Sequence, residues 1–402
     1  MVTKMLLRGT QNVSKAQLAE EVEGMGAQIS SDSDREITYL NVTCFKNDIS
    51  RAVSMIGDTI SNASFDAAEL EIAKQEMAQA HEVSNKDQQE VLLEAAHFNS
   101  FRDHMLGQPK RGDPDNLQNI SVDMLNSYRA ANFTGEKMVI VGTGSVDHDA
   151  LVDMVKEGFG SVQQTSSSAG ADEKCVYVPA LLMMRDDEMY NANVGVFFDA
   201  PSVNHEDYYQ FQLMRHMIGN YSIERNCEHL NDVSKQYNAT HQLLGELPDV
   251  TKQSCHYYAY SDCGLWGSYL FGNEVFVRQM NWCGVAAPTF YGDFVTEVEV
   301  VRARNAYWNS LMAAQSPAQS NAEIGKQMLQ TGRRVTRSEI AKRISHADSE
   351  SIKGLAYEWF YDSEPGFTNW GPIQETSSIG SYKYFKINTM TTVANFHQSL
   401  FT

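Results

Sequence analysis

The side chains best suited to metal chemistry in this chain are its histidines, cysteines and carboxylates. We consider three short groupings as candidate ligand pairs: His81-Glu82, Cys227-x-His229 and Cys255-His256. A helical zinc site needs two imidazoles one turn apart, because this spacing points both at one ion. None of the eleven histidines has a second histidine four residues away. We therefore interpret the three groupings as structural, and we expect no metal and no cofactor.

Motifs of other enzyme classes do not replace the metal motif. The sequence has no phosphate-binding glycine loop and no G-x-S-x-G elbow, and Gly142-Thr143-Gly144 lacks the last glycine of a dinucleotide-binding turn. The run Tyr257-Tyr258-x-Tyr260 could stack on bases, but alternating aromatics on a strand more commonly pair in a core. We assign none of these residues a chemical role.

Composition and charge narrow the class of partner. The formal net charge is −19 and the pI is about 5.0, which opposes binding to phosphate backbones, so we expect no nucleic-acid partner. Such acidity could attract basic partners, although it commonly confers only solubility. No run of about 18 apolar residues predicts a membrane span. Residues 1–8 have neither an apolar core nor a cleavage site, so we expect no signal or transit peptide there.

The cysteine pattern favours free thiols. The six cysteines are scattered, with no C-x-x-C pair among them: Cys44, Cys175, Cys227, Cys255, Cys263 and Cys283. A disulfide framework would show closer and more regular spacings. The pattern therefore predicts reduced thiols and a reducing compartment.

Hydrophobic periodicity predicts alternating helices and strands in the first half. The predicted helices are 18–25, 49–62, 66–99, 121–132 and 147–158, and the predicted strands are 37–45 and 138–142. The second half repeats this order weakly, since 229–239 resembles 18–27 and the strand 255–260 resembles 37–45. A repeat of this length indicates two similar domains.

A polar, small-residue stretch at 161–174 marks the expected domain boundary. We predict an N-terminal domain at 1–162, a linker at 163–174 and a C-terminal domain at 175–402. A chain of 402 residues is long enough for two such domains.

Several motifs, taken in order, carry a family resemblance. They are Met5-Leu6-Leu7-Arg8-Gly9-Thr10, Glu20-x-x-Glu23-Gly24-Met25-Gly26-Ala27, Arg35-Glu36-x-Thr38, Thr331-Gly332-Arg333-Arg334 and Gly371-Pro372-Ile373. Together they resemble the mitochondrial processing peptidase/core-protein branch of the inverted-zinc-motif (pitrilysin-type) peptidases, and the beta/core 1 type more than the alpha type. The resemblance spans nearly the whole chain. It implies two α+β domains, each a mixed or antiparallel sheet packed against helices on one side, with the opening strands of the first domain absent.

The resemblance also implies where zinc would bind. The family uses His-x-x-Glu-His on a helix, with the Glu as general base and a distant Glu as third ligand. Aligned on Met5, the second His falls at Lys4 and the base at Thr3, and the third ligand falls at Ala80. A Lys ammonium about 4 Å from a dication would be repelled by roughly 8 kcal/mol at an effective dielectric of ~20. We therefore predict a degenerate site at Thr3, Lys4 and Ala80, with no catalysis.

The function implied by the resemblance is that of a structural core subunit of mitochondrial ubiquinol–cytochrome c reductase (complex III). Its implied partners are a core 2/alpha-type subunit, cytochrome b, cytochrome c1 and the Rieske subunit in a dimeric complex. Its implied location is the matrix side of the inner membrane, reached through those partners. The alternative is a subunit of the presequence-cleaving processing peptidase, as a non-catalytic partner or as the catalytic chain.

Overall fold

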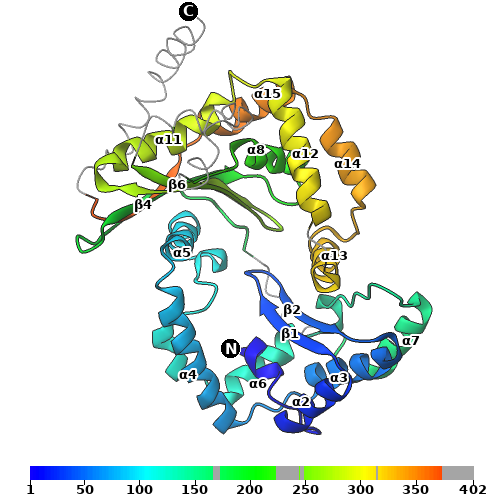
Figure 1. The fold of residues 1–402 in the computed structure, drawn as a ribbon. Coiled ribbons are helices and arrows are strands. Elements are labelled where there is room, and N and C mark those ends of the chain that lie inside the picture. Colours follow the sequence, from blue (N-terminus) through cyan, green and yellow to red (C-terminus); the bar gives the residue numbers. More distant parts are fainter. Residues whose placement is uncertain (166–172, 223–243, 245–248, 314–315, 374–402) are drawn as a thin grey trace, which may run out of the picture. The chain divides into compact units, whose positions relative to one another are not determined.

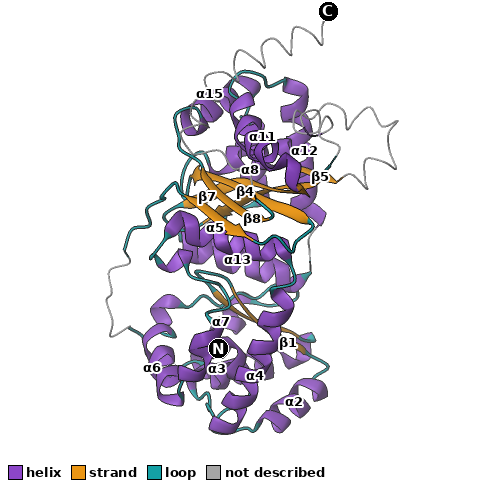
Figure 2. Ribbon diagram, turned by 90° about the vertical axis from the view of Figure 1, so that its left-hand side faces the viewer, coloured by secondary structure: helices purple, strands orange, loops and turns teal. Residues whose placement is uncertain are grey.

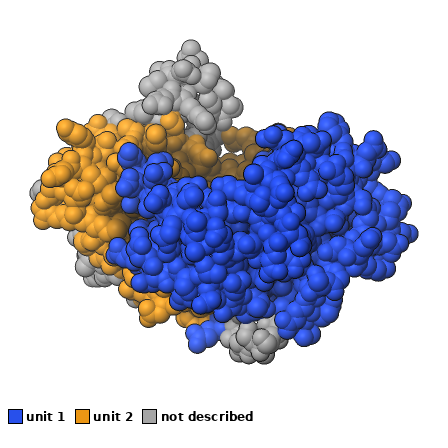
Figure 3. Space-filling model, turned by 90° about the horizontal axis from the view of Figure 1, so that it is seen from below, with its two compact units in different colours: residues 1–86, 110–173, 313–335 blue, residues 87–109, 174–312, 336–402 orange. Residues whose placement is uncertain are grey.

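The computed structural model describes residues 1–165, 173–222, 244, 249–313 and 316–373. The chain folds into two compact units, each built from several separate segments of the sequence (Figure 3). Unit 1 comprises Met1–Lys86, Lys110–Glu173 and Ala313–Val335, and unit 2 comprises Asp87–Pro109, Lys174–Met312 and Thr336–Thr402.

Unit 1 is mainly helical, with one small sheet (Figure 1). Its helices are α1 (Val2–Leu6), α2 (Lys15–Gly24), α3 (Ile49–Ser61), α4 (Ala67–Ser84), α6 (Val122–Asn132), α7 (His148–Gly158) and α13 (Pro317–Thr331). Three 3₁₀ helices lie at Lys46–Asp48, Pro114–Asn119 and Gly135–Lys137. The strands β1 (Gln28–Ser33) and β2 (Thr38–Thr43) pair antiparallel.

Local signals set the ends of these elements. The Ser14 and Gln17 side chains cap the first turn of α2 in a capping box. Gly26 has φ +58°, a left-handed conformation that glycine adopts without steric cost, so the chain can turn into β1. The predicted helix near 18–25 and strand near 37–45 are confirmed by α2 and β2.

Two predicted elements of the first half are wrong. The helix expected at 66–99 is two helices, because Asp87 accepts hydrogen bonds from the N–H groups of Gln89 and Glu90 and so starts a new helix. Residues 138–142 form no strand. In the described part of unit 1 the sheet has two strands, β1 and β2, and neither pairs with this segment. Its β-branched residues therefore lack the partner that a strand requires.

Unit 2 is built on a six-stranded mixed sheet with the order β3-β8-β4-β7-β6-β5. All neighbours are antiparallel except β3 and β8. Its strands are β3 (Leu181–Arg185), β4 (Asn191–Ala200), β5 (Asn220–Ser222), β6 (Val250–Ala259), β7 (Gly264–Asn273) and β8 (Gly366–Gly371). The other elements among the described residues of unit 2 are α5 (Gln88–Phe101), α8 (Tyr208–Ile218), α11 (Val277–Phe290), α12 (Glu297–Ala313), α14 (Arg337–Ser345), α15 (Ser349–Phe360) and the 3₁₀ helices Met105–Gly107 and Glu274–Phe276.

Helices cover both faces of this sheet, whereas we expected them on one side. Figures 1 and 2 show α11 on one face and α5 on the other. Both helices contact the central strand β4, which is buried along almost its whole length. A strand buried on both faces requires a nearly continuous apolar run, and Val194-Gly195-Val196-Phe197-Phe198 supplies it.

Each unit includes a helix from the half of the sequence that otherwise builds the other unit. In unit 1, α13 contacts β2, and its Lys326 ammonium lies 3.3 Å from the Asp34 carboxylate. In unit 2, the Asn99 amide of α5 donates to the carbonyls of Ala180 and Phe367 at 2.9 and 3.0 Å. After a first passage through unit 2 at 87–109, the chain returns to unit 2 at 173–174, beside the predicted linker. The predicted division does not include the segments 87–109, in unit 2, and 313–335, in unit 1.

Two further expectations concern the described residues. None of the described helices is long and apolar enough to cross a membrane. The described cysteines are free thiols: Cys44, Cys175, Cys255, Cys263 and Cys283. Cys227 and the segment 229–239, which resembles 18–27, lie outside the described residues.

Candidate functional site

The two predicted motif positions near the N-terminus lie on α1, which packs against α4. Met5 and Leu6 of α1 are fully buried in one apolar cluster with Leu70 and Ala73 of α4. This contact places α1, which carries Thr3 and Lys4, against α4, on which the third ligand was expected at Ala80.

The carboxylate that faces Lys4 is Glu76. Its Oε2 lies 3.5 Å from the Lys4 Nζ, and both side chains are nearly half exposed. Glu76 is one helical turn before Ala80, the position that we predicted from the sequence. The place beside Lys4 is thus occupied by an ion pair between α1 and α4.

Arg8 extends this ion pair into a network. One guanidinium nitrogen of Arg8 lies 2.6 Å from Glu69 Oε2 and another lies 2.6 Å from Glu76 Oε2. The Lys15 ammonium adds a contact of 3.1 Å to Glu69. Arg8 is almost fully buried, so its charge depends on these two carboxylates for compensation. We call Lys4, Arg8, Lys15, Glu69 and Glu76 the ionic cluster.

The ionic cluster favours the charged form of its acids. Hydrogen bonds from Arg8, followed by one from Lys15, hold the pKa of Glu69 below its ordinary value. The hydrogen bond from Arg8 likewise lowers the pKa of Glu76, and the charge of Lys4 adds to the effect. At neutral pH both carboxylates are therefore ionised and paired with cationic side chains of this chain.

Ala80 and His81 lie in a different set of contacts. The Ala80 carbonyl accepts a hydrogen bond from the Arg111 guanidinium at 3.3 Å, and His81 Nε2 lies 3.2 Å from the Arg111 carbonyl. These contacts tie the end of α4 to the loop around 111. The structure brings Thr3 and Lys4 together on one helix, and it pairs Lys4 with Glu76 instead of a group at Ala80.

The side chains at this place do not fit a zinc ion. Thr3 and Lys4 offer a hydroxyl and an ammonium where the family motif has a general base and an imidazole. Glu76 is the one carboxylate that faces Lys4, and it is already bound by two cations. In the described part of the chain, no three His, Cys, Asp or Glu side chains are grouped so that they could hold a metal. No reaction step through a metal follows from this arrangement.

The sequence contained a signal for Glu69 and Glu76 that motif alignment missed. The two residues are seven positions apart, which is about two helical turns, so they share one face of α4. Three cations, Lys4, Arg8 and Lys15, come from the segment just before α2 and its first turn. Acidic residues on one helix face and basic residues on a neighbouring segment indicate an interhelical ion-pair cluster.

The Cys255-His256 grouping is part of the unit 2 sheet. His256 Nε2 lies 2.8 Å from Ser254 Oγ and 3.2 Å from the Gln89 amide nitrogen. Burial lowers the pKa of His256 to about 4, so its ring is neutral at physiological pH. Burial raises the pKa of the Cys255 thiol. These contacts join β6 to α5 and support the structural interpretation, while Cys227 and His229 lie outside the described residues.

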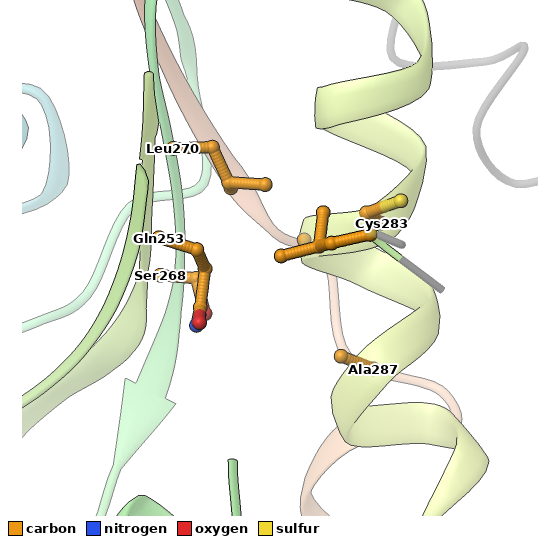
Figure 4. Close-up of a pocket in the computed structure, with 7 residues that line it drawn as sticks. Gln253, Ser268, Leu270, Cys283 and Ala287 are labelled. Atoms are coloured by element: carbon orange, nitrogen blue, oxygen red, sulfur yellow. The ribbon is translucent and has the colours of Figure 1, made fainter. Parts of the chain in front are cut away.

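A small cavity lies in unit 2 between the sheet and α11 (Figure 4). The residues that line it are Leu244, Gln253, Ser268, Leu270, Cys283, Gly284 and Ala287. Its free volume, about 10 Å³ for the centre of a water molecule, suits one water at most. Substrate pockets are typically of several hundred Å³, so this cavity is a packing defect and no binding site for a substrate.

Comparisons with known proteins identify relatives along most of the chain. Residues 1–113 match the family model described as Insulinase (Peptidase family M16), and residues 119–280 match the one described as Peptidase M16 inactive domain. The probable mitochondrial-processing peptidase subunit beta of Schizosaccharomyces pombe is 28% identical over 383 residues, which cover 92% of this chain and 81% of that protein. The mitochondrial-processing peptidase subunit beta of Homo sapiens is 27% identical over 386 residues, which cover 92% and 75%.

A solved structure shares the fold. A chain of Complex III2 from Candida albicans with Inz-5 bound superimposes with a TM-score of 0.81, covering 96% of this chain and 88% of that one. The sequence identity is 17%, so this similarity concerns the fold alone. It confirms the predicted α+β architecture. The two matched family models show that the chain carries two domains of the M16 peptidase family.

Proposed function

Because the chain belongs to the M16 peptidase family, we propose that it is a non-catalytic core subunit, of the core 1/beta type, of mitochondrial ubiquinol–cytochrome c reductase. The observation that carries the proposal is the ion pair between Lys4 and Glu76. In the alignment on Met5, Lys4 takes the place of an imidazole ligand, and its ammonium pairs with the Glu76 carboxylate, which supports a non-catalytic role. The fold shared with a chain of Complex III2 supports the assembly.

In this role the chain acts as a scaffold. The ionic cluster fastens α1 to α4, which keeps the shape of a peptidase domain without its chemistry. The proposed partners are a core 2/alpha-type subunit, cytochrome b, cytochrome c1 and the Rieske subunit, on the matrix side of the inner membrane. The chain would then reach the membrane through these subunits.

A second candidate is a subunit of a mitochondrial processing peptidase. The identity of 27–28% to proteins named as its beta subunit, over 92% of this chain, favours this candidate. The residues at Thr3 and Lys4 argue for a non-catalytic partner in such an assembly, since neither is suited to a motif role. Presequence peptides are basic, and the net charge of −19 would attract them.

One preparation distinguishes these candidates. The tagged chain is purified from mitochondrial membranes in mild detergent, and haem, zinc and presequence cleavage are measured on the same sample. The proposal predicts copurifying haem, and any zinc and cleavage that are present should be unchanged in Lys4→Met and Glu76→Gln. Glu82→Gln, an exposed change on the same helix, is the matched control.

The opposite results are equally informative. Cleavage without haem would favour the processing-peptidase assembly. Loss of stoichiometric zinc and of cleavage in Glu76→Gln, with Glu82→Gln unaffected, would show that this chain holds the catalytic metal and would overturn the non-catalytic assignment.

A further inference from the structure

Two of the described cysteines lie against each other in unit 2. Cys175 stands in the irregular segment between residue 173 and β3, and Cys263 stands in the turn between β6 and β7. Both are buried in one small apolar cluster with Phe101 and Leu265. They are 88 positions apart in the sequence, so their spacing predicted no pairing.

Backbone contacts hold the two residues together. The Cys175 N–H donates to the Asp262 carboxylate at 2.8 Å, next to Cys263 in the chain. The turn itself is closed by the Tyr260 N–H, which donates to the Cys263 carbonyl at 2.9 Å. The two side chains belong to one buried cluster, and the interaction with Cys175, followed by burial, raises the pKa of the Cys263 thiol. Cys263 therefore keeps its proton at rest.

The other buried cysteines have different surroundings. Cys283 lies on α11 beside the small cavity, and burial alone raises its pKa to about 12. The carbonyl of Cys255 lies 3.4 Å from the Arg215 guanidinium, within β6. These two residues serve as internal comparisons for any thiol chemistry.

We propose that Cys175 and Cys263 are a dithiol that a peroxide oxidises to an intrachain disulfide. The disulfide would join the segment through which the chain enters unit 2 to the β6–β7 turn. This inference is independent of the proposed function, because it rests on unit 2 alone.

The reaction balances with one peroxide. The sulfur of one cysteine attacks a peroxide oxygen, the O–O bond breaks, and water leaves a sulfenic acid behind. The second sulfur then attacks the sulfenic sulfur, the S–S bond forms, and a second water leaves. Two thiols lose two electrons and two protons in total, and hydrogen peroxide is reduced to two waters.

Local opening controls the reaction. The segment 174–180 has no helix or strand, and its Val176 is 66% exposed. Because both thiols are buried and Cys263 holds its proton, oxidation must follow a transient opening of this segment. Once formed, the disulfide closes a long loop, which raises the stability of unit 2 against unfolding.

The experiment uses the full-length chain and hydrogen peroxide. After oxidation and blocking of free thiols, non-reduced peptide mapping should show a Cys175–Cys263 linked peptide that disappears on reduction. The thermal midpoint of the oxidised protein should rise and should return on reduction. Cys175→Ser and Cys263→Ser should each abolish the linked peptide and the rise, whereas Cys283→Ser should leave both unchanged.

Two controls keep the test decisive if a variant folds poorly. One sample of the wild-type protein is oxidised in its folded state and a second sample in concentrated urea. The yield of the Cys175–Cys263 peptide should exceed that of other cysteine pairs in the folded sample, and this excess should vanish in urea. The proposal is overturned if the folded wild type yields no such peptide, even in mild urea at which hydrogen exchange reports opening of 174–180. Equal yields of several cysteine pairs in the folded protein would overturn it as well.

Discussion

At the scale of single residues, Arg8 decides how α1 is held. Its guanidinium is nearly buried and bonds to two carboxylates that would otherwise repel each other across one helix face. Lys4 and Lys15 contribute from more exposed positions, where solvent screens their charges. The helix on which we predicted a degenerate metal motif is therefore held by ion pairs, and these are centred on Arg8, which lies outside the predicted motif.

Arg8→Met should lower the free energy of unfolding by about 1–2 kcal/mol. The change removes charge-assisted hydrogen bonds from a buried donor, and the half-exposed Glu76 moderates the loss. Lys15→Met, which removes an exposed partner of Glu69, should cost less than about 1 kcal/mol. Urea denaturation measures both, and equal effects would contradict the central role of Arg8.

The ionic cluster also predicts a pH dependence. Arg8 lowers the pKa of Glu69 and Glu76 from the ordinary value of 4.5, so the unfolded chain protonates these groups first as pH falls. Their contribution is complete above that value and is lost as pH falls through the lowered pKa of the folded state. Urea midpoints below about pH 4.5 should therefore fall more steeply in the wild type than in Arg8→Met. Parallel pH profiles would show that the cluster does not stabilise the fold.

At the scale of elements, close helix contacts in unit 1 depend on glycine. A Cβ at Gly57 of α3 would lie 2.2 Å from the Gly158 carbonyl oxygen at the end of α7, nearer than atoms can approach. The helices therefore meet backbone to backbone at this place. Sequence periodicity predicted both helices, but it could not reveal that they touch at Gly57 and Gly158.

Gly57→Ala should destabilise unit 1 by about 1–3 kcal/mol, because α3 and α7 must move apart. Gly354→Ala in α15 is the matched control, since a Cβ there meets nothing within 4 Å. It should stabilise the protein by about 0.5–1 kcal/mol through the lower entropy of the unfolded chain. Thermal denaturation tests the pair, and a neutral Gly57→Ala would mean that the contact is looser than described.

At the scale of the whole molecule, the exchanged helices make each unit depend on both halves of the sequence. The predicted C-terminal domain, 175–402, lacks α5, whose Leu92 and Ala96 are fully buried in unit 2. The predicted N-terminal domain, 1–162, lacks α13, which packs on β2. We therefore expect that neither 1–162 nor 175–402 folds independently of the other half of the chain.

A fragment of residues 175–402 should consequently unfold without a cooperative transition or should aggregate. Adding a peptide of residues 87–109 should restore cooperative unfolding, because it returns α5 and the Asn99 hydrogen bonds to the sheet. The same peptide with Asn99→Ala is the control and should restore less. Circular dichroism during urea denaturation measures each sample. Cooperative unfolding of the fragment alone would support the simple division at the linker.

The sequence by itself determined the family, the α+β class and most helix positions, and it predicted a degenerate motif at Thr3 and Lys4. These features depend on local spacing and residue type, which a single chain displays directly. The tertiary structure alone decided that Glu76 faces Lys4, that 138–142 forms no strand, and that α5 covers the second face of the unit 2 sheet. Each of these depends on which distant segments pack together, and that choice follows from burial across the whole fold.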